Sequence, residues 1–210
     1  MIRVLLVDDH AILRAGLKEI MMRELEPITW GEAQDAQQAM AQILAHDWDL
    51  VILDITLPGR SGLDVLRELR QTRPKVPLLI LSALPEDQFG KRVLKAGAAG
   101  YLTKESAPEE LVKAVRKVLS GGRYVSPALA EKLALDLGGK GGEYLHERLS
   151  GRELEVLRMI ASGMTITQIA EMLHLAVTTI GTHRARILEK MDMTTTAELI
   201  RYAVRNNLVD

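Results

Sequence analysis

The chain has 210 residues, a length that accommodates one or two domains of ordinary size. Its composition, 47% hydrophobic and 26% charged, is that of a globular chain, and no apolar run approaches the ~20 residues of a membrane-spanning helix. The absence of cysteine excludes disulfides, thiolate metal sites and cysteine nucleophiles, and the net charge of −1 gives no global sign of nucleic-acid binding.

In the first part of the chain, short apolar runs alternate with amphipathic helical stretches. The runs predict strands at residues 4–7, 28–33, 50–53, 76–81 and 98–102. The helical stretches cover residues 10–24, 35–46, 62–71, 86–96 and 108–119. Three of the runs consist almost entirely of Val, Leu and Ile, which is typical of strands that helices cover on both faces. Five such units predict an α/β, flavodoxin-like, doubly wound five-stranded parallel sheet.

The alternation stops near residue 120, and no strand pattern returns. A short helix is predicted at residues 126–137, and four glycines among residues 138–142 predict a flexible tether. Ser150 and Glu153 then have the spacing of a reciprocal helix cap. Further helices are predicted near residues 167–173, 177–190 and 195–206. The predicted organisation is a first domain, a linker and a small all-α helix-turn-helix domain, at residues 1–121, 122–146 and 147–210.

Ionisable side chains stand where the predicted strands of the first domain end. Asp8 and Asp9 follow the first strand and Asp54 follows the third, and these two strands flank the ligand-binding edge of a doubly wound sheet. Three carboxylates gathered there repel one another unless a cation compensates them, and their oxygens suit Mg²⁺. Ser82 ends the fourth strand and Lys104 follows the fifth. This set suits a phosphoryl group, with a carboxylate as nucleophile and the metal and the lysine on its oxygens.

Four motifs resemble the receiver domain of two-component response regulators, and the match covers essentially all of residues 1–120. They are Val-Asp-Asp-His at residues 7–10, Leu-Asp-Ile-Thr-Leu-Pro-Gly at 53–59, Leu-Ser-Ala at 81–83 and Gly-Tyr-Leu-Thr-Lys at 100–104. The resemblance implies that Asp54 accepts a phosphoryl group from a sensor histidine kinase. It also implies that Asp9, Asp54 and the backbone carbonyl of Thr56 bind Mg²⁺ directly, while Asp8 acts largely through water.

The same resemblance implies a conformational switch. Ser82 and Tyr101 match the switch pair of the family, and Lys104 matches its phosphate-binding lysine. An aspartyl phosphate adds a charge of nearly −2 and three acceptor oxygens, so Ser82 can bond to one of them and Tyr101 can swing inward to fill the space that it leaves. We interpret His10, near the start of the first predicted helix, as a structural residue.

In the C-terminal domain the order of the helices indicates DNA binding, although the net charge does not. Residues 145–210 contain eight Lys and Arg against eight Asp and Glu, so net charge does not predict DNA binding. A short helix, a turn and a longer helix nevertheless form the helix-turn-helix scheme, in which the second helix enters the major groove by its N-terminal part. Thr178 and Thr179 stand at that end. Side chains that suit DNA phosphates recur along the helix: His183, Arg184, Arg186 and Lys190.

Leu-Ser-Gly-Arg-Glu-Leu-Glu-Val-Leu at residues 149–157, Ile-Ala at 169–170 and the stretch 177–190 resemble the LuxR-type (NarL-family) DNA-binding domain. The resemblance covers about residues 147–208 and implies a recognition helix at 177–190. Its implied DNA contacts are Thr178, Thr179, Thr182, His183, Arg184 and Arg186, to which we add Lys190. Gly181 stands where the family often has lysine or glutamate, so one customary contact is missing. The last helix, which carries Leu199, Tyr202, Ala203 and Val204, matches the dimer-forming helix of the family, although ordinary packing inside the domain accounts for at least half of these residues.

Together these features predict a transcription regulator of the NarL/LuxR (FixJ-like) type. We expect a non-enzymatic protein that phosphorylation of Asp54 drives to form homodimers on a two-fold site in double-stranded DNA. RNA polymerase is a further candidate partner, and no membrane partner is expected. Because no secretory signal pattern precedes the first acidic residues, we expect a cytoplasmic location.

Two alternatives stay open at this point. The first is a phosphatase that uses Asp54 as its nucleophile, although Thr56 occupies the position where such enzymes usually carry a second aspartate. The second is a protein of the same fold that binds DNA constitutively or in response to a ligand. Turnover of a phosphate ester would favour the first. Failure of acetyl phosphate to modify the Mg²⁺-loaded protein, together with tight DNA binding, would favour the second.

Overall fold

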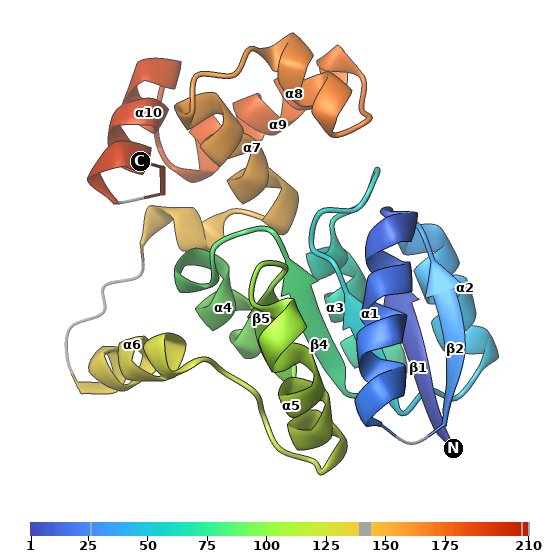
Figure 1. The fold of residues 1–210 in the computed structure, drawn as a ribbon. Coiled ribbons are helices and arrows are strands. Elements are labelled where there is room, and N and C mark those ends of the chain that lie inside the picture. The colour runs from blue at the N-terminus through green and yellow to red at the C-terminus, as the bar shows by residue number, and fades with distance from the viewer. Residues whose placement is uncertain (26, 139–143, 207, 210) are drawn as a thin grey trace. The chain divides into compact units, whose positions relative to one another are not determined.

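The computed structural model describes residues 1–25, 27–138, 144–206 and 208–209 and divides into two compact units (Figure 1). The first unit spans Met1–Lys140 and the second spans Gly141–Asp210. The glycine tether predicted at residues 138–142 lies, from residue 139 onward, outside the described residues. Within the described ranges, no helix is long and apolar enough to cross a membrane.

The first unit is a five-stranded parallel sheet between two layers of helices (Figure 1). Its strands are β1 (Ile2–Val7), β2 (Ile28–Ala33), β3 (Leu50–Leu53), β4 (Leu78–Ser82) and β5 (Gly100–Thr103). Its helices are α1 (Ala11–Glu24), α2 (Ala36–Ala45), α3 (Gly62–Thr72), α4 (Glu86–Lys95), α5 (Ala107–Leu119) and α6 (Pro127–Gly138). The strand order is β2-β1-β3-β4-β5, with every pair parallel, which confirms the predicted doubly wound, flavodoxin-like sheet.

The hydrophobic core of this unit explains why its central strands lack polar alternation. One face of the sheet packs against α1 and α5, where Val4 and Leu6 of β1 join Leu17 and Met21 of α1. Helices α2, α3 and α4 cover the other face (Figure 1). All four residues of β3 are buried, because a strand with helices on both sides exposes neither face to water.

Helix α6, predicted as part of a linker, packs against α4 of the first unit. Leu129 is 1% exposed and lies over Gly90, where an added Cβ would stand only 2.6 Å from Leu129 Cδ2. At the start of α6, the amide and the hydroxyl of Ser126 both donate hydrogen bonds to the carboxylate of Glu86. The small residue in α4 therefore makes room for α6, and Glu86 anchors its first turn.

The second unit is helical. Its elements are a 3₁₀ turn η1 (Leu145–Arg148) and the helices α7 (Gly151–Ala161), α8 (Ile166–Met172), α9 (Val177–Lys190) and α10 (Thr196–Arg205). The cap predicted from Ser150 and Glu153 is present: the Ser150 side chain accepts from the Glu153 amide, and the Glu153 carboxylate accepts from the Ser150 amide. The turn η1 was not predicted, whereas the helix ends agree with the predicted ones to within one or two residues.

Candidate functional site

The predicted acidic site forms at the carboxyl edge of the sheet. Because β1 and β3 pair with Val7 opposite Leu53, the residues that follow them meet there. Asp8 and Asp54 are 4% and 3% exposed. Lys104 Nζ lies 2.7 Å from Asp8 Oδ2 and 2.7 Å from Asp54 Oδ2. One ammonium group thus pairs with two buried carboxylates from different strands.

Backbone groups fix the remaining oxygens of the two carboxylates. Asp54 Oδ1 accepts the Thr56 N–H at 3.0 Å, and Asp8 Oδ1 accepts the His10 N–H at 2.7 Å. These are side chain to backbone bonds two residues along the chain, the pattern of Asx turns. Gly62, the first residue of α3, approaches the Asp54 carbonyl so closely that an added Cβ would lie 2.0 Å from its oxygen. The turn after β3 and the start of α3 together hold Asp54 in place.

The charges in the site shift the pKa values of both partners. Burial raises the pKa of Asp54 above its ordinary value, and the neighbouring Asp8 adds to this effect, while Lys104 and the Thr56 amide oppose it. For Lys104, burial alone would lower the pKa, but the facing carboxylates of Asp54 and Asp8 raise it overall. Lys104 is therefore charged at neutral pH. With Asp9 beside them, the carboxylates outnumber this single cation, so a further cation would relieve their repulsion.

The acidic cluster next to Lys104 has the donors for a metal ion. Asp8, Asp9 and His10 each offer a ligand atom, and these atoms lie within 4.8 Å of one another. Asp9 Oδ1 is buried and lies 2.8 Å from His10 Nδ1, yet outside hydrogen-bonding geometry. Carboxylate oxygens are the ligands that hard divalent cations prefer. The cluster could therefore bind a metal ion, and the structure brings His10, which we had interpreted as structural, within reach of the same ion.

The two predicted switch residues meet at one residue of the loop between β4 and α4. Ser82 is fully buried, and its hydroxyl accepts the Leu84 N–H at 3.3 Å. Tyr101 is also fully buried, and its hydroxyl donates to the Leu84 carbonyl at 2.8 Å. In this structure the tyrosine therefore already has the inward position that we associated with the phosphorylated state.

Sequence reasoning missed Arg14 of α1, whose buried side chain holds the backbone of Asp8 at the acidic site. Its side chain is 7% exposed; Nη1 donates to the Asp8 carbonyl at 2.6 Å, and Nε donates to Glu32 at 2.8 Å. A signal was present, because Arg14 precedes the buried Leu17 and Met21 by three and seven residues and so shares their helix face. An arginine on a buried face needs partners, and here they fix the end of β1.

In the second unit, α8 and α9 form the predicted helix-turn-helix pair, and the turn between them contains His174, which has a positive φ of 51°. Thr178, Thr182 and Arg186 of α9 are exposed, and their spacing of four residues aligns them on one side of the helix. Thr179 and His183 are half-buried beside them. The N-terminal half of α9 therefore presents polar side chains to solvent.

Two of the predicted DNA contacts have partners inside the unit. Arg184 Nε donates to Thr196 Oγ1 at 2.9 Å, which ties α9 to α10. Lys190 Nζ lies 2.7 Å from Glu153 Oε2. Burial alone would raise the pKa of Glu153, but hydrogen bonds from Lys190 and Ser150 lower it below its ordinary value. Lys190 thus balances a buried carboxylate, and because its side chain is still 41% exposed, its DNA contact stays a prediction.

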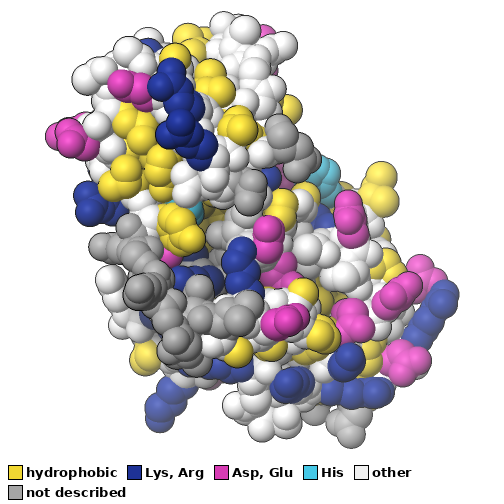
Figure 2. Space-filling view, turned by 90° about the vertical axis from the view of Figure 1, so that its left-hand side faces the viewer, with side chains coloured by type: hydrophobic (Ala, Val, Ile, Leu, Met, Phe, Trp, Pro, Cys, Tyr) yellow, Lys and Arg dark blue, Asp and Glu magenta, His cyan; other side chains and the backbone are white. Residues whose placement is uncertain are grey.

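The predicted dimer residues of α10 differ in their exposure. Leu199 and Ala203 are fully buried, so they pack inside the unit and are not available to a partner. Tyr202 is half-buried, and its hydroxyl lies 2.9 Å from His146 Nδ1. The large apolar side chains that this helix exposes are Ile200 and Val204, 36% and 51% exposed. Figure 2 shows hydrophobic side chains on this unit beside a column of basic ones.

Comparison with known proteins gives matches over both units. The family model for the response regulator receiver domain matches residues 4–116, and that for bacterial regulatory proteins of the luxR family matches residues 147–203. The response regulator GacA of Pseudomonas aeruginosa is 36% identical over 212 residues, covering 100% of this chain and 99% of that protein. The response regulator UvrY of Escherichia coli K12 is 35% identical over 210 residues, covering 99% of this chain and 96% of that protein.

Solved structures give the same match. RcsB from Salmonella enterica serovar Typhimurium, solved with promoter rprA and the phosphomimetic BeF3⁻, has a TM-score of 0.63 and 25% sequence identity. The alignment covers 96% of this chain and 97% of that one. The similarity thus extends over both the sheet unit and the helical unit.

Proposed function

Because the chain belongs to the response regulators, which join a receiver domain to a LuxR-type DNA-binding domain and regulate transcription through phosphorylation, we propose that Asp54 is its phosphoacceptor. The observation that carries this proposal is the pair of 2.7 Å contacts from Lys104 Nζ to Asp8 and Asp54. They gather a nucleophilic carboxylate, a second acid and a cation at one point. A sensor histidine kinase is the proposed donor, and Mg²⁺ is the proposed cofactor.

In the proposed reaction, a carboxylate oxygen of Asp54 attacks the phosphorus atom. The bond from phosphorus to the donor nitrogen breaks, and its electron pair stays with the donor histidine. Lys104 pairs with Asp54 before the reaction and is placed to bind a phosphoryl oxygen afterwards, through a charge-assisted hydrogen bond. Mg²⁺ would be held by Asp8, Asp9, Asp54 and the Thr56 carbonyl, and it would neutralise charge on the phosphoryl oxygens.

The loop between β4 and α4 is the proposed route from the phosphate to the rest of the protein. The Ser82 hydroxyl accepts a long bond, 3.3 Å, from Leu84, and turning toward a phosphoryl oxygen would break it. Leu84 also accepts from Tyr101, so both switch residues act on one backbone segment. Two residues later, Glu86 begins α4 and holds Ser126 at the start of α6. A change in this loop would therefore reach α6.

We propose that the second unit binds double-stranded DNA through α9 as a homodimer. The exposed side of α9 supports this, with Thr178, Thr182 and Arg186 as the central contacts. Thr179, His183 and Arg184 would contribute from the edges of this surface. Val204, expected on the dimer-forming helix, and its exposed neighbour Ile200 are the proposed dimer contacts of α10. RNA polymerase is a further proposed partner, and the proposed location is the cytoplasm, where the DNA is.

Incubation with acetyl phosphate and Mg²⁺, followed by intact-mass measurement, tests the phosphoacceptor. The protein is expected to gain the mass of one phosphoryl group, and Asp54→Ala is expected to gain none. Asp47→Ala is the matched control, because the side chain of Asp47 is 85% exposed and lies outside the site. A normal mass gain in Asp54→Ala would refute the assignment.

Turnover of p-nitrophenyl phosphate tests the proposal that the chain is not an enzyme. No turnover is expected, because Thr56 supplies no carboxyl group to protonate a leaving group or activate water. Repeated turnover that Asp54→Ala abolishes would instead support the phosphatase alternative.

Selection from random duplex DNA, with the protein held in its BeF3⁻ form, tests the second unit. A sequence with two-fold symmetry is expected. Arg186→Gln is expected to weaken binding about tenfold, as loss of a DNA contact does. Arg148→Gln removes the same charge from an exposed position in η1 and is expected to leave binding within about twofold. Equal losses in the two variants would show that α9 is not the contact surface.

A further inference from the structure

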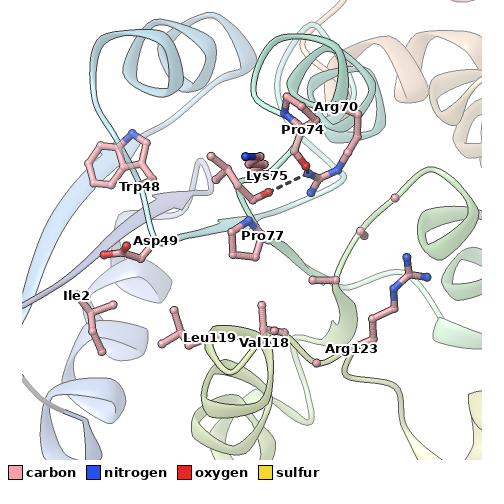
Figure 3. Close-up of a pocket in the computed structure, with 16 residues that line it drawn as sticks. Ile2, Trp48, Asp49, Arg70, Pro74, Lys75, Pro77, Val118, Leu119 and Arg123 are labelled. Carbon is pink, nitrogen blue, oxygen red and sulfur yellow. Dashed lines mark hydrogen bonds between the residues drawn. The ribbon is translucent and has the colours of Figure 1, made fainter.

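The first unit has a pocket at the amino edge of its sheet, the opposite end from the acidic site (Figure 3). Its walls come from the start of β1, from the segments that precede β3, β4 and β5, from α3 and from the end of α5 with the residues that follow it. The pocket volume is ≈ 890 Å³, within the range of about 300–1,000 Å³ that is typical of small-molecule sites. None of the residues proposed above for phosphorylation or DNA binding lines it.

Part of the lining is apolar. Trp48 and Asp49 stand at one side of the pocket, Arg70 stands at the other, and Val118 and Leu119 lie between them along a third wall (Figure 3). The indole N–H of Trp48 donates to the Gln42 carbonyl at 2.9 Å. Because that polar atom is already paired, the tryptophan offers the pocket only apolar surface.

The charged part of the lining is mainly basic. It contains Arg70, Lys75 and Arg123, with Asp49 as the acidic member among the described residues. The Asp49 carboxylate already accepts the Arg3 N–H at 2.8 Å. Among the described residues, none of the three basic side chains forms an ion pair. The pocket therefore concentrates positive charge that the protein itself does not neutralise.

Arg70 is held in place by the chain but is not saturated by it. Its Nη1 donates to the carbonyl oxygens of Pro74 and Val76, at 2.6 and 2.9 Å. Its Nε is buried and has no hydrogen-bond partner. Gly97, with a φ of +98°, passes so close that an added Cβ would lie 3.2 Å from that nitrogen. The guanidinium is thus fixed at the pocket with a donor to spare, and such a donor is costly to leave unpaired.

Repulsion between Arg70 and Arg123 also favours an anion in this pocket. Burial lowers the pKa of Arg70 below its ordinary value, and the nearby charge of Arg123 lowers it further. An anion close to both guanidinium groups would relieve this repulsion. Guanidinium groups favour phosphate, sulfonate and carboxylate groups, because their planar donors match two oxygens at once.

We propose that this pocket binds a small organic anion. Its phosphate, sulfonate or carboxylate group would lie at Arg70 and Arg123, and its apolar body would lie against Trp48 and Leu119. The proposal does not depend on phosphorylation of Asp54, since the two sites lie at opposite edges of the sheet.

Titration with 1-naphthalenesulfonate tests this proposal, because the probe combines an anionic group with an apolar body and cannot donate a phosphoryl group. In the full-length Trp30→Phe variant, Trp48 is the remaining tryptophan of the two in the chain, so its fluorescence reports on the pocket. Saturable binding with one probe per chain is expected. Arg70→Gln and Arg123→Gln are each expected to weaken it about tenfold.

Arg73→Gln is the matched control, because Arg73 does not line the pocket and lies 3.2 Å from Asp47. It is expected to leave the affinity within about twofold. Arg123 is exposed and forms no hydrogen bond among the described residues. If Arg70→Gln fails to fold, the probe affinity of Arg123→Gln therefore tests the proposal. Absence of saturable binding, equal affinity in the three variants, or equal affinity for the neutral 1-naphthalenesulfonamide would overturn the proposal.

Discussion

Replacing Gly62 by alanine is expected to disturb the acidic site without altering any of its charged groups. A Cβ at this position would lie 2.0 Å from the Asp54 carbonyl oxygen and 2.9 Å from Ile55 Cα. Since ordinary contact begins near 3.4 Å, the Asp54 backbone or the start of α3 must move by about 1.4 Å. The obstructing atoms belong to the backbone, so no side-chain rotation can relieve the contact.

This displacement sets the size of the expected effect. Overpacking of a core typically costs about 1–3 kcal/mol, and the rigid neighbours place Gly62→Ala near the upper end of that range. The shift also moves the Asp54 carboxylate away from Lys104, whose Nζ lies 2.7 Å from it. A misplacement of ~1 Å in a reacting group can cost about a hundredfold in rate. We therefore expect both lower stability and much slower phosphorylation.

Urea unfolding measures the first effect, and the time course of mass gain with acetyl phosphate measures the second. Gly16→Ala in α1 is the matched control, because nothing lies within 4 Å of the Cβ that it adds. Alanine in a helix is favoured over glycine by about 1 kcal/mol, so this variant should gain stability and react normally. If Gly62→Ala matched Gly16→Ala in both measurements, the inferred close approach to Asp54 would be wrong.

Three further changes have expected outcomes. Because burial raises the pKa of Asp54 above its value in the unfolded chain, ionising this carboxyl group lowers the folding stability. Asp54→Asn should therefore be more stable than the unsubstituted protein in metal-free solution at neutral pH. Urea unfolding should show this difference vanish as the pH falls toward 3.8. Leu129→Ala should lose about 2 kcal/mol of packing between α6 and α4, measured as faster hydrogen exchange in α6 with little change in β1 or β3. Gly181→Ala adds a Cβ with nothing within 4 Å and should raise the thermal stability of the second unit by about 1 kcal/mol; a fall in DNA affinity at the same time would show that the backbone there approaches DNA closely.

The sheet that carries the acidic site could be predicted from sequence, because the features that indicate its strands are local in the chain. Continuous apolar runs such as Leu50–Leu53 predict strands covered on both faces, and the residue after each run lies at the carboxyl edge by the geometry of a parallel sheet. For that reason Asp8, Asp54 and Lys104 could be expected near one another, and the pairing of β1 with β3 brings the two carboxylates together.

Tertiary packing decided which side chains of a helix are buried and which stay exposed. Leu199 and Ala203 are buried while Ile200 and Val204 are exposed, and the amphipathic pattern of α10 does not reveal which side α7 covers. Lys190 has the spacing of a DNA contact, yet its partner Glu153 lies 37 residues away in sequence. Pairings over such distances depend on how helices pack, which local propensity does not encode.

The sequence by itself determined the order of the elements, the sheet class and the set of ionisable groups at its carboxyl edge, because each follows from periodicity and from residues adjacent to a strand. The tertiary structure alone decided that Arg14 supports Asp8, that α6 folds onto α4, and that Arg70 keeps an unpaired donor in a basic pocket. These features join segments that are distant along the chain. Their free energies come from burial and from paired charges, which exist only once the chain has folded.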